Sequence, residues 1–232
     1  MILKGLQKTT LLDYPTKVAC TVFTPGCNFR CPFCHNASLV VNTDLSDTVS
    51  IDYFFDYLKK RKGILDGVCI TGGEPLIQKG IEEFITNIKS LGYCVKVDTN
   101  GSQPQTLYNL IKNGLVDYVA MDIKAPKTKY SAVCGLDNDD ILNNVCQSVD
   151  LLMQKTVDFE FRTTVVKELH TIDCFHEIGA WIKGADKYFL QQFKDSEDLL
   201  VNGQFSAYDE ENMKKILEIV QTYIPNAQLR GI

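Results

Sequence analysis

The ten residues CNFRCPFCHN, 27–36, place three thiols in the spacing C-x3-C-x2-C, at Cys27, Cys31 and Cys34. One short loop can wrap such a set around a single metal centre. A structural zinc site needs four closed ligands, usually in two spaced pairs, and no second C-x2-C pair occurs. A [4Fe–4S] cluster normally takes four thiolates, so three leave one iron open to a substrate or cofactor. The spacing favours an open, catalytic cluster, with zinc and coincidental core cysteines as the alternatives.

Around this motif, the composition is that of an ordinary soluble chain. The 232 residues are 45% hydrophobic and 23% charged, and no linker-like tract divides them, so we expect one domain over 1–232. A net charge of −5 argues against a general nucleic-acid binder. No run of 18 apolar residues suggests a membrane span, and MILKGLQKTT lacks a signal-peptide core, so we expect a cytoplasmic protein. Nine cysteines, an odd number, suit a disulfide framework badly.

Apolar, β-rich runs alternate with stretches of helical spacing. Strands are expected at Lys17–Thr24, Gly67–Thr71, Tyr93–Asp98, Asp117–Ile123, Val157–Val166 and Lys187–Phe193. Apolar stripes at i, i+3, i+4 and i+7 predict helices beginning near Ile51, Ile81, Ile141, Phe175 and Met213. This alternation predicts an α/β fold, with a parallel sheet and outer helices. The sheet could be open and doubly wound, or a barrel short of the full eight units.

Polar residues gather where the expected strands end. The endings are Thr71-Gly72-Gly73-Glu74-Pro75, Asp98-Thr99-Asn100-Gly101, Asp122-Ile123-Lys124 and Gln191-Gln192-Phe193. On the fifth strand, alternation puts Glu160, Arg162 and Thr164 on one face, which is costly in a core unless that face lines a polar cavity. Because the carboxyl ends of parallel strands meet at one edge, we expect these residues to form a single site with the cysteine loop.

With Phe33 as its aromatic residue, the motif C-x3-C-x-aromatic-C resembles the signature of the radical S-adenosylmethionine (SAM) superfamily. The segment Gly72-Gly73-Glu74-Pro75 is similar to that superfamily's second motif, which holds the methionyl amino group. The resemblance implies a partial (β/α)6 TIM-like barrel, a [4Fe–4S] cluster and bound S-adenosylmethionine.

Further segments resemble the glycyl-radical-enzyme activating proteins, relatives of the pyruvate formate-lyase activating enzyme. They are Cys34-His35-Asn36, Asp98–Gly101, Asp122–Lys124, Lys8–Pro15, Phe161–Val166 and Leu190–Phe193, and they are most like the branch labelled anaerobic ribonucleoside-triphosphate reductase activating protein. The match covers nearly the whole chain. It departs at Thr16, where glycine is common, and at Lys167-Glu168, which replaces a usual Pro-Gly. No extra cysteine-rich insert is present, so one cluster is expected.

The resemblance also implies roles for individual residues. Cys27, Cys31 and Cys34 ligate iron, and the other cofactor-binding positions are Phe33, Asn36, Gly72, Gly73, Glu74, Asp98, Thr99, Asp122 and Lys124. Phe33 and Asn36 lie near the adenine, whereas Asp98, Thr99 and Asp122 match positions that hold a monovalent cation in pyruvate formate-lyase activating relatives. Lys124 and Arg162 are the catalytic candidates. Arg162 could hold the cofactor carboxylate, guide a glycine loop, or form a structural ion pair with Glu160 or Asp98.

In such proteins a reduced cluster cleaves S-adenosylmethionine, and the 5′-deoxyadenosyl radical removes a hydrogen from a glycine of a partner. The implied partners are a glycyl radical enzyme and a flavodoxin or ferredoxin that donates electrons. Two alternatives remain: a small-molecule synthase such as 7-carboxy-7-deazaguanine synthase, and a non-catalytic iron–sulfur or zinc binding module. His170 and His176 fall in a helix-like segment and are expected at the surface.

Overall fold

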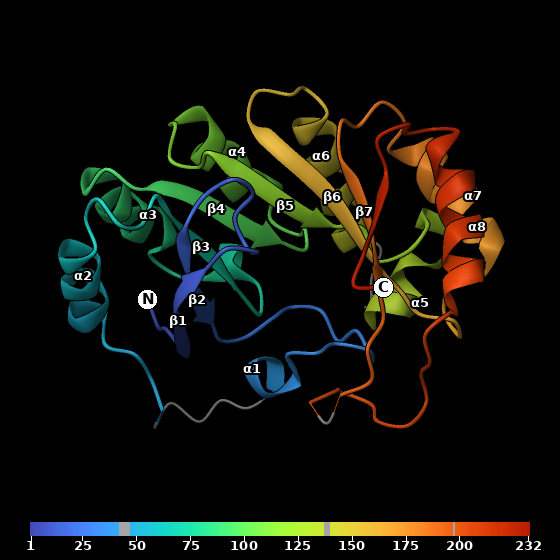
Figure 1. Ribbon diagram of the computed structural model, residues 1–232, viewed down its shortest axis with the longest axis horizontal. Helices are drawn as coiled ribbons and strands as arrows, with labels where there is room; N and C mark the ends of the chain where they lie inside the picture. The colour runs from blue at the N-terminus through green and yellow to red at the C-terminus, as the bar shows by residue number, and fades with distance from the viewer. Residues whose placement is uncertain (42–46, 137–139, 197) are drawn as a thin grey trace.

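The structure is a computed structural model that describes residues 1–41, 47–136, 140–196 and 198–232. Its single sheet contains eight strands that follow one another in chain order (Figure 1). They are β1 (Gly5–Thr10), β2 (Ala19–Thr24), β3 (Gly67–Gly72), β4 (Cys94–Thr99), β5 (Tyr118–Asp122), β6 (Asp158–Val165), β7 (Tyr188–Gln192) and β8 (Gln228–Arg230). The first pair is antiparallel and every later pair is parallel. The expected α/β partial barrel is confirmed, and its edges β1 and β8 stay unpaired with each other.

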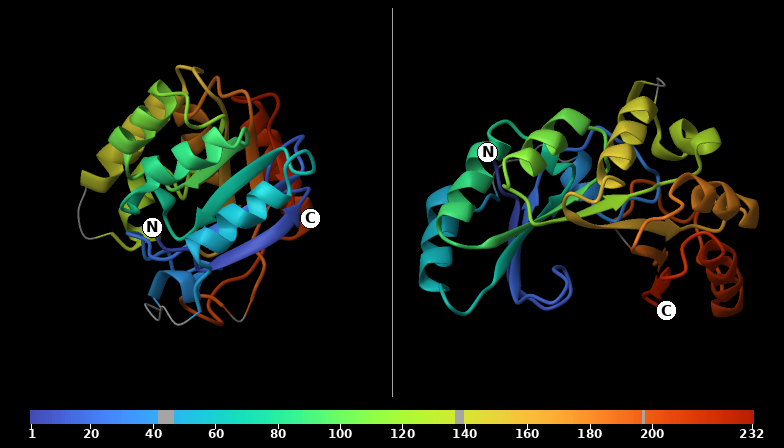
Figure 2. Two further views of the ribbon diagram at one scale, coloured as in Figure 1. Left: turned by 90° about the vertical axis from the view of Figure 1, so that its left-hand side faces the viewer. Right: turned by 90° about the horizontal axis from the view of Figure 1, so that it is seen from above.

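The helices lie mostly on the outer side of the curved sheet (Figure 2), whereas α1 lies across from the sheet, below it in Figure 1. They are α1 (Ala37–Val41), α2 (Ile51–Lys60), α3 (Ile81–Ser90), α4 (Pro104–Lys112), α5 (Tyr130–Cys134), α6 (Asp140–Leu152), α7 (Ile172–Trp181) and α8 (Glu210–Gln221), with 3₁₀ turns η1 (Pro75–Ile77) and η2 (Lys127–Lys129). All six expected strands and all five expected helical stripes are confirmed. The sequence pattern did not predict β1, β8, α1, α4 or α5. No described helix is long and apolar enough to cross a membrane.

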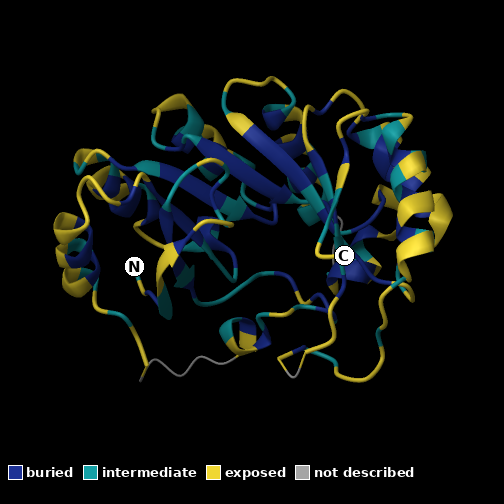
Figure 3. Ribbon diagram, viewed as in Figure 1, coloured by how far each residue is buried: buried dark blue, intermediate teal, exposed yellow. Residues whose placement is uncertain are grey.

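The alternation of each strand separates an apolar outer face from a polar inner one. On β4, Val95 and Val97 are buried in the hydrophobic core, whereas Lys96 and Asp98 occupy the alternate positions. The outer helices follow the same logic: Ser50 caps α2 by accepting the Tyr53 N–H at 3.1 Å, and Phe54 and Leu58 are buried. In Figure 3 the strands are mostly buried, and the outward faces of the helices are exposed. The polar inner face therefore belongs to the site.

Two glycines let the end of β3 pack directly on the chain that enters the cysteine loop. A Cβ at Gly72 would lie 2.4 Å from the backbone of Thr24, and one at Gly73 would lie 1.9 Å from the Gly26 carbonyl oxygen. Gly72 also has a φ of 116°, which only glycine adopts easily. The Gly73 N–H donates to the Thr24 carbonyl at 2.9 Å. The glycines of this turn thus fix the position of the cysteine loop.

Replacing Gly73 with alanine should therefore disturb the site as well as the fold. We expect the free energy of unfolding to fall by about 3 kcal/mol, because backbone must move to admit the methyl group. Gly203→Ala is the control: nothing lies within 4 Å of the added methyl group, so only the cost of its positive φ of 72°, a feature that Gly73 lacks, should be lost, about 1 kcal/mol. Urea unfolding measures both. Equal losses in the two variants would contradict the close contact.

Thr16 explains one departure from the family pattern. Its φ is 63°, in the left-handed region that favours glycine, and it lies in the turn between β1 and β2. The glycine common at this position in the resembling proteins would adopt that conformation without steric cost. Thr16 therefore keeps the turn geometry despite the substitution.

Candidate active site

The candidate site is a cavity of about 260 Å³ at the carboxyl ends of the strands. It is lined by Cys27, Phe29, Cys31, Phe33, Cys34, His35, Asn36, Val40, Thr71, Gly72, Gly73, Asp98, Thr99, Asn100, Asp122, Lys124, Arg162, Thr164 and Gln191. The structure thus brings together every candidate residue named from the sequence except Glu74. It also places the cysteine loop opposite the endings of β3 to β7.

The three cysteines of the loop face this one cavity. Cys31 is buried, and Cys27 and Cys34 are partly buried. The loop is tied down by backbone hydrogen bonds, including one from the Arg30 N–H to the Cys134 carbonyl at 2.9 Å. Burial raises the pKa of Cys27 to about 12, whereas a hydrogen bond with the Cys134 thiol lowers the pKa of Cys31. The loop is therefore fixed around thiols that must lose their protons to bind iron.

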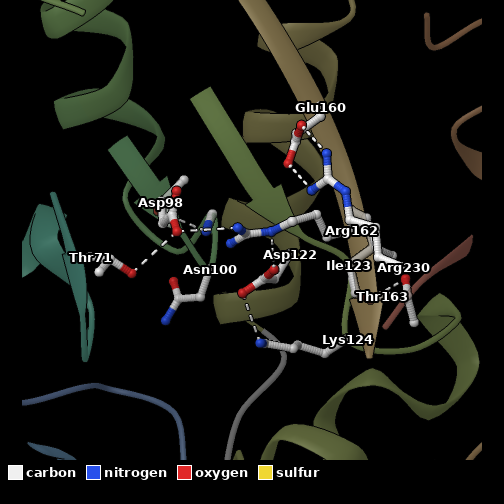
Figure 4. Close-up of polar contacts among 12 residues, drawn as sticks. Thr71, Asp98, Asn100, Asp122, Ile123, Lys124, Glu160, Arg162, Thr163 and Arg230 are labelled. Carbon is white, nitrogen blue, oxygen red and sulfur yellow. Dashed lines mark hydrogen bonds and ion pairs between the residues drawn. The ribbon is translucent and has the colours of Figure 1, made fainter. Parts of the chain in front are cut away.

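Charged side chains form a connected row across the inner face of the sheet (Figure 4). Arg162 lies between two carboxylates: its Nη1 is 3.1 Å from Asp98 Oδ2, and its Nε is 3.0 Å from Asp122 Oδ1. Lys124 Nζ bonds the other oxygen of Asp122 at 3.0 Å. Lys96 bonds Asp98 from the other side. Arg162 thus pairs with Asp98 and Asp122, and not with Glu160, which binds Arg230 instead.

These pairs keep all five groups of the row charged. Burial alone would raise the pKa of Asp98, but Arg162 and Lys96 outweigh it and lower that pKa to about 2. Against its own burial, Asp122 has its pKa lowered by Arg162 and Lys124. The carboxylates in turn raise the pKa values of Lys124 and Arg162. The row contains three cations and two anions, so it carries one excess positive charge beside the cavity. The cations are Lys96, Lys124 and Arg162, and the anions are Asp98 and Asp122.

The residues of the expected monovalent-cation site, Asp98, Thr99 and Asp122, are already engaged by other groups of the protein. Thr99 Oγ1 donates to Glu74 at 2.8 Å, and both aspartates are already bound by the chain's own cations. Asp98 accepts from four donors, which fill its lone pairs, so a cation would have to displace one of them. The surroundings of Asp98 do not fit the expected cation, because Lys96, on the same face of β4, and Arg162 already bond its carboxylate.

Glu74 lies beneath the cavity and does not line it. Its side chain is fully buried, and it accepts hydrogen bonds from Leu76 N at 3.0 Å, Thr99 Oγ1 at 2.8 Å and Asn100 N at 2.6 Å. Its own N–H donates to the Gly26 carbonyl at 2.8 Å. The Glu74 side chain therefore joins the ends of β3 and β4, and the cofactor contact expected of the Gly72–Glu74 turn stays a prediction about its backbone groups.

The pKa of Glu74 makes that structural role testable by pH. Burial outweighs the three hydrogen bonds and raises its pKa from 4.5 to about 7. The folded chain then holds the proton more tightly than the unfolded one. The resulting stabilisation is complete below pH 4.5 and is lost as the pH rises toward 7.

We expect the free energy of unfolding of the wild type to carry a loss on the order of 3 kcal/mol over this window, which Glu74→Gln should lack. Glutamine should also cost about 1–3 kcal/mol at every pH, because its amide N–H faces a donor. Urea midpoints measured at a series of pH values give the difference between the two proteins. A difference that stays constant with pH would contradict the raised pKa.

Three residues at the site were given no cofactor role from the sequence, although Asn100 and Gln191 lie in the strand endings that were expected to form it. Asn100 Nδ2 lies 3.6 Å from Cys27 Sγ and 3.0 Å from Asn28 Oδ1, and its place in Asp98-Thr99-Asn100-Gly101 was the available signal. Gln191 lines the cavity from the end of β7. His35 stacks on Phe193, with ring centroids 5.3 Å apart, and its Nε2 lies 2.6 Å from the Lys194 carbonyl oxygen.

The prediction that both histidines lie at the surface is confirmed for His176 and wrong for His170. His176 is exposed on α7, but His170 is completely buried in the turn after β6. Its Nε2 lies 2.7 Å from the Lys124 carbonyl, and its Nδ1 accepts the Val166 N–H at 3.0 Å. The helical periodicity misled the prediction because this segment is a turn that folds back beneath Lys124. His170 thereby supports the backbone of a cavity residue.

The residues present fit a cluster and a SAM molecule. Three thiols from one loop face one cavity, and no fourth cysteine lines it. Among the described residues, no three His, Cys, Asp or Glu side chains converge as they would around a single ion. Each thiolate of a cubane binds a different iron, so its ligands do not need that convergence. Three other features of the cavity suit the groups of SAM. The glycine backbone can accept from its amino group, the excess positive charge can attract its carboxylate, and Phe33 can pack against its adenine base.

Comparisons with known proteins agree with this geometry. A profile of the radical SAM superfamily matches residues 21–171. The Methanocaldococcus jannaschii protein MJ1227, named among the glycyl-radical enzyme activating enzymes, is 32% identical over 249 residues, covering 100% of this chain and 96% of its own. Two solved structures share the fold. A domain of a pyruvate-formate lyase-activating enzyme from Bacteroides vulgatus has a TM-score of 0.55 at 16% identity, over 71% of this chain and 99% of its own. Streptococcus suis SuiB bound to S-adenosylmethionine has a TM-score of 0.70 at 15% identity, over 91% and 52%.

Proposed function

The chain belongs to the radical SAM superfamily, and from this premise we propose that it activates a glycyl radical enzyme. When bound, the reduced cluster and S-adenosylmethionine supply a 5′-deoxyadenosyl radical, which takes a hydrogen atom from a backbone glycine of the partner. The likeness to MJ1227 over the full length of the chain supports this activity. Anaerobic ribonucleoside-triphosphate reductase is the first partner we propose, and a flavodoxin or ferredoxin is the proposed electron donor.

Each part of the cavity has a proposed role toward the cofactors. Cys27, Cys31 and Cys34 hold three irons of the cluster. Carbonyl oxygens of the turn at Gly72 and Gly73 receive the amino group of S-adenosylmethionine, and Lys124 and Arg162 receive its carboxylate; their charges are held in place by Asp98 and Asp122. Phe33 and Asn36 are the proposed contacts of the adenine. We further infer that these residues belong to one domain that spans the chain.

The observation that carries the proposal is an open route from the cofactor cavity to the protein surface. A second cavity of about 560 Å³ shares His35, Thr164 and Gln191 with it. This second cavity reaches exposed residues beyond β7 and at the free edge of the sheet, namely Lys194, Ser196, Asp198 and Gly231. A polypeptide loop needs such an open route, whereas a small heterocycle would be better held in a closed polar pocket.

The experiment pairs the reconstituted protein with candidate glycyl radical enzymes under anaerobic, reducing conditions. We expect 5′-deoxyadenosine release to be slow alone and to rise with the correct partner, together with a glycyl radical signal in electron paramagnetic resonance. A peptide containing the partner's glycine loop should substitute in part. Rapid cleavage with a small heterocycle, and no radical on any partner, would instead identify a small-molecule synthase.

A further inference from the structure

Lys96 is a buried lysine that no cofactor role explains. Its side chain is 3% exposed and points from β4 to the inner face of the sheet. It does not line the cofactor cavity; it lines a separate cavity of about 500 Å³ on the far side of the ionic row. A buried ammonium group is costly unless it is paired, so its position indicates a specific electrostatic task.

Lys96 forms its ion pair with Asp98. Asp98 Oδ1 accepts hydrogen bonds from Lys96 Nζ and, at 3.8 Å, from Cys69 Sγ. Asp98 Oδ2 accepts from Thr71 Oγ1 at 3.2 Å and from Arg162 Nη1 at 3.1 Å. A carboxylate offers about four lone-pair directions. All of them are filled by donors from β3, β4 and β6, so a metal cation would have to displace a group of the protein to bind Asp98.

We propose that Lys96 takes the place of a bound monovalent cation at the cofactor site, so that this enzyme binds S-adenosylmethionine without Na⁺ or K⁺. A bound ion would add one positive charge beside Asp98 and Asp122. Here that charge is covalently attached to the chain, and with Arg162 and Lys124 it leaves the single excess positive charge that a carboxylate ligand requires. The other groups that face Lys96 are Cys69 and Arg162, so Asp98 is its anionic partner. This inference holds whichever protein is the partner.

The test compares salts at equal ionic strength. Affinity of the anaerobically reconstituted wild type for S-adenosylmethionine is measured in sodium, potassium and tetramethylammonium chloride. Because ionic strength fixes the screening, we expect the three dissociation constants to agree within about twofold. A loss of tenfold or more in tetramethylammonium chloride, reversed by sodium or potassium, would overturn the proposal.

Variants of Lys96 then test whether this side chain makes S-adenosylmethionine binding independent of sodium and potassium. In Lys96→Met, the affinity should fall about tenfold in tetramethylammonium chloride and recover with sodium or potassium. Its melting temperature without cofactor should also rise with sodium or potassium, unlike that of the wild type. Lys96→Arg keeps the charge and should remain insensitive to the salt. A folded Lys96→Met protein that binds like the wild type in all three salts would refute the role of Lys96. If Lys96→Met does not fold, the wild-type series and Lys96→Arg decide.

Discussion

Replacing Cys31 with alanine should abolish the cluster and with it all S-adenosylmethionine cleavage. Iron per chain, measured after anaerobic reconstitution, should fall from about four to below about one, because each loop thiolate holds a different iron. Cys27→Ala and Cys34→Ala should behave in the same way. Iron analysis and the visible absorption of the cluster provide the measurement.

Two other cysteines serve as controls. Cys146 is half-buried on α6, far along the chain from the loop, and Cys146→Ala should retain full iron. Cys134 is the more demanding control, because its thiol bonds that of Cys31 without lining the cavity. Cys134→Ala should also retain iron. A cluster that persists in the Cys31→Ala, Cys134→Ala double variant would refute the ligand assignment.

Arg162→Met should give the second-largest effect, because one side chain holds two partly buried carboxylates. Its removal leaves Asp98 with Lys96 and Asp122 with Lys124, each deprived of one cation. Removing one partner of a fully buried ion-pair network costs about 3–5 kcal/mol of folding free energy, and these partly buried groups should lose less. Because Arg162 is also a proposed partner of the cofactor carboxylate, and its removal cancels the excess positive charge of the row, we expect the affinity for S-adenosylmethionine to fall about a hundredfold, which corresponds to about 3 kcal/mol. Equilibrium dialysis against labelled cofactor measures it.

Two comparisons separate binding from folding. Arg162→Lys keeps the charge but loses the planar fork that reaches both aspartates, so an intermediate loss is expected. Lys124→Met removes a cation that bonds Asp122 alone, and it should weaken binding less than Arg162→Met. Iron content should stay at the wild-type level in all three. Unchanged affinity with a lowered melting temperature would make Arg162 purely structural.

The parts of the fold that the sequence predicts are those whose pattern is local. Strands β2 to β7 are apolar runs with strand periodicity, and the cavity residues follow them directly, so alternation and topology were enough. Strand β1, with the sequence GLQKTT, is a largely polar edge, and β8 has three residues. Neither carries a hydrophobic signal. Pairing with a neighbour, which is not visible locally, makes them strands.

The parts of the site that could not be predicted depend on which charges meet. The sequence places Lys96 and Asp98 on one face of a strand, but it does not say that Arg162, 64 residues farther on, bonds the same carboxylate. Glu74 belongs to a recognisable motif, yet its side chain turns away from the cavity to join two strand ends. Local periodicity cannot distinguish these outcomes, because tertiary packing decides them.

The order of the strands in the sheet has a consequence for synthesis on the ribosome. Since every strand pairs with the strands next to it in the chain, the sheet can grow from β1 onward as residues emerge. The addition of β8 differs from the earlier steps because it also supplies the charged partner of a buried residue. Glu160, buried on β6, has its only cationic partner among the described ion pairs in Arg230, at the end of β8, with Nη1–Oε1 at 2.7 Å. Until β8 emerges from the exit tunnel, Glu160 lacks this partner, so completion of the barrel waits for the pairing of β8 with β7.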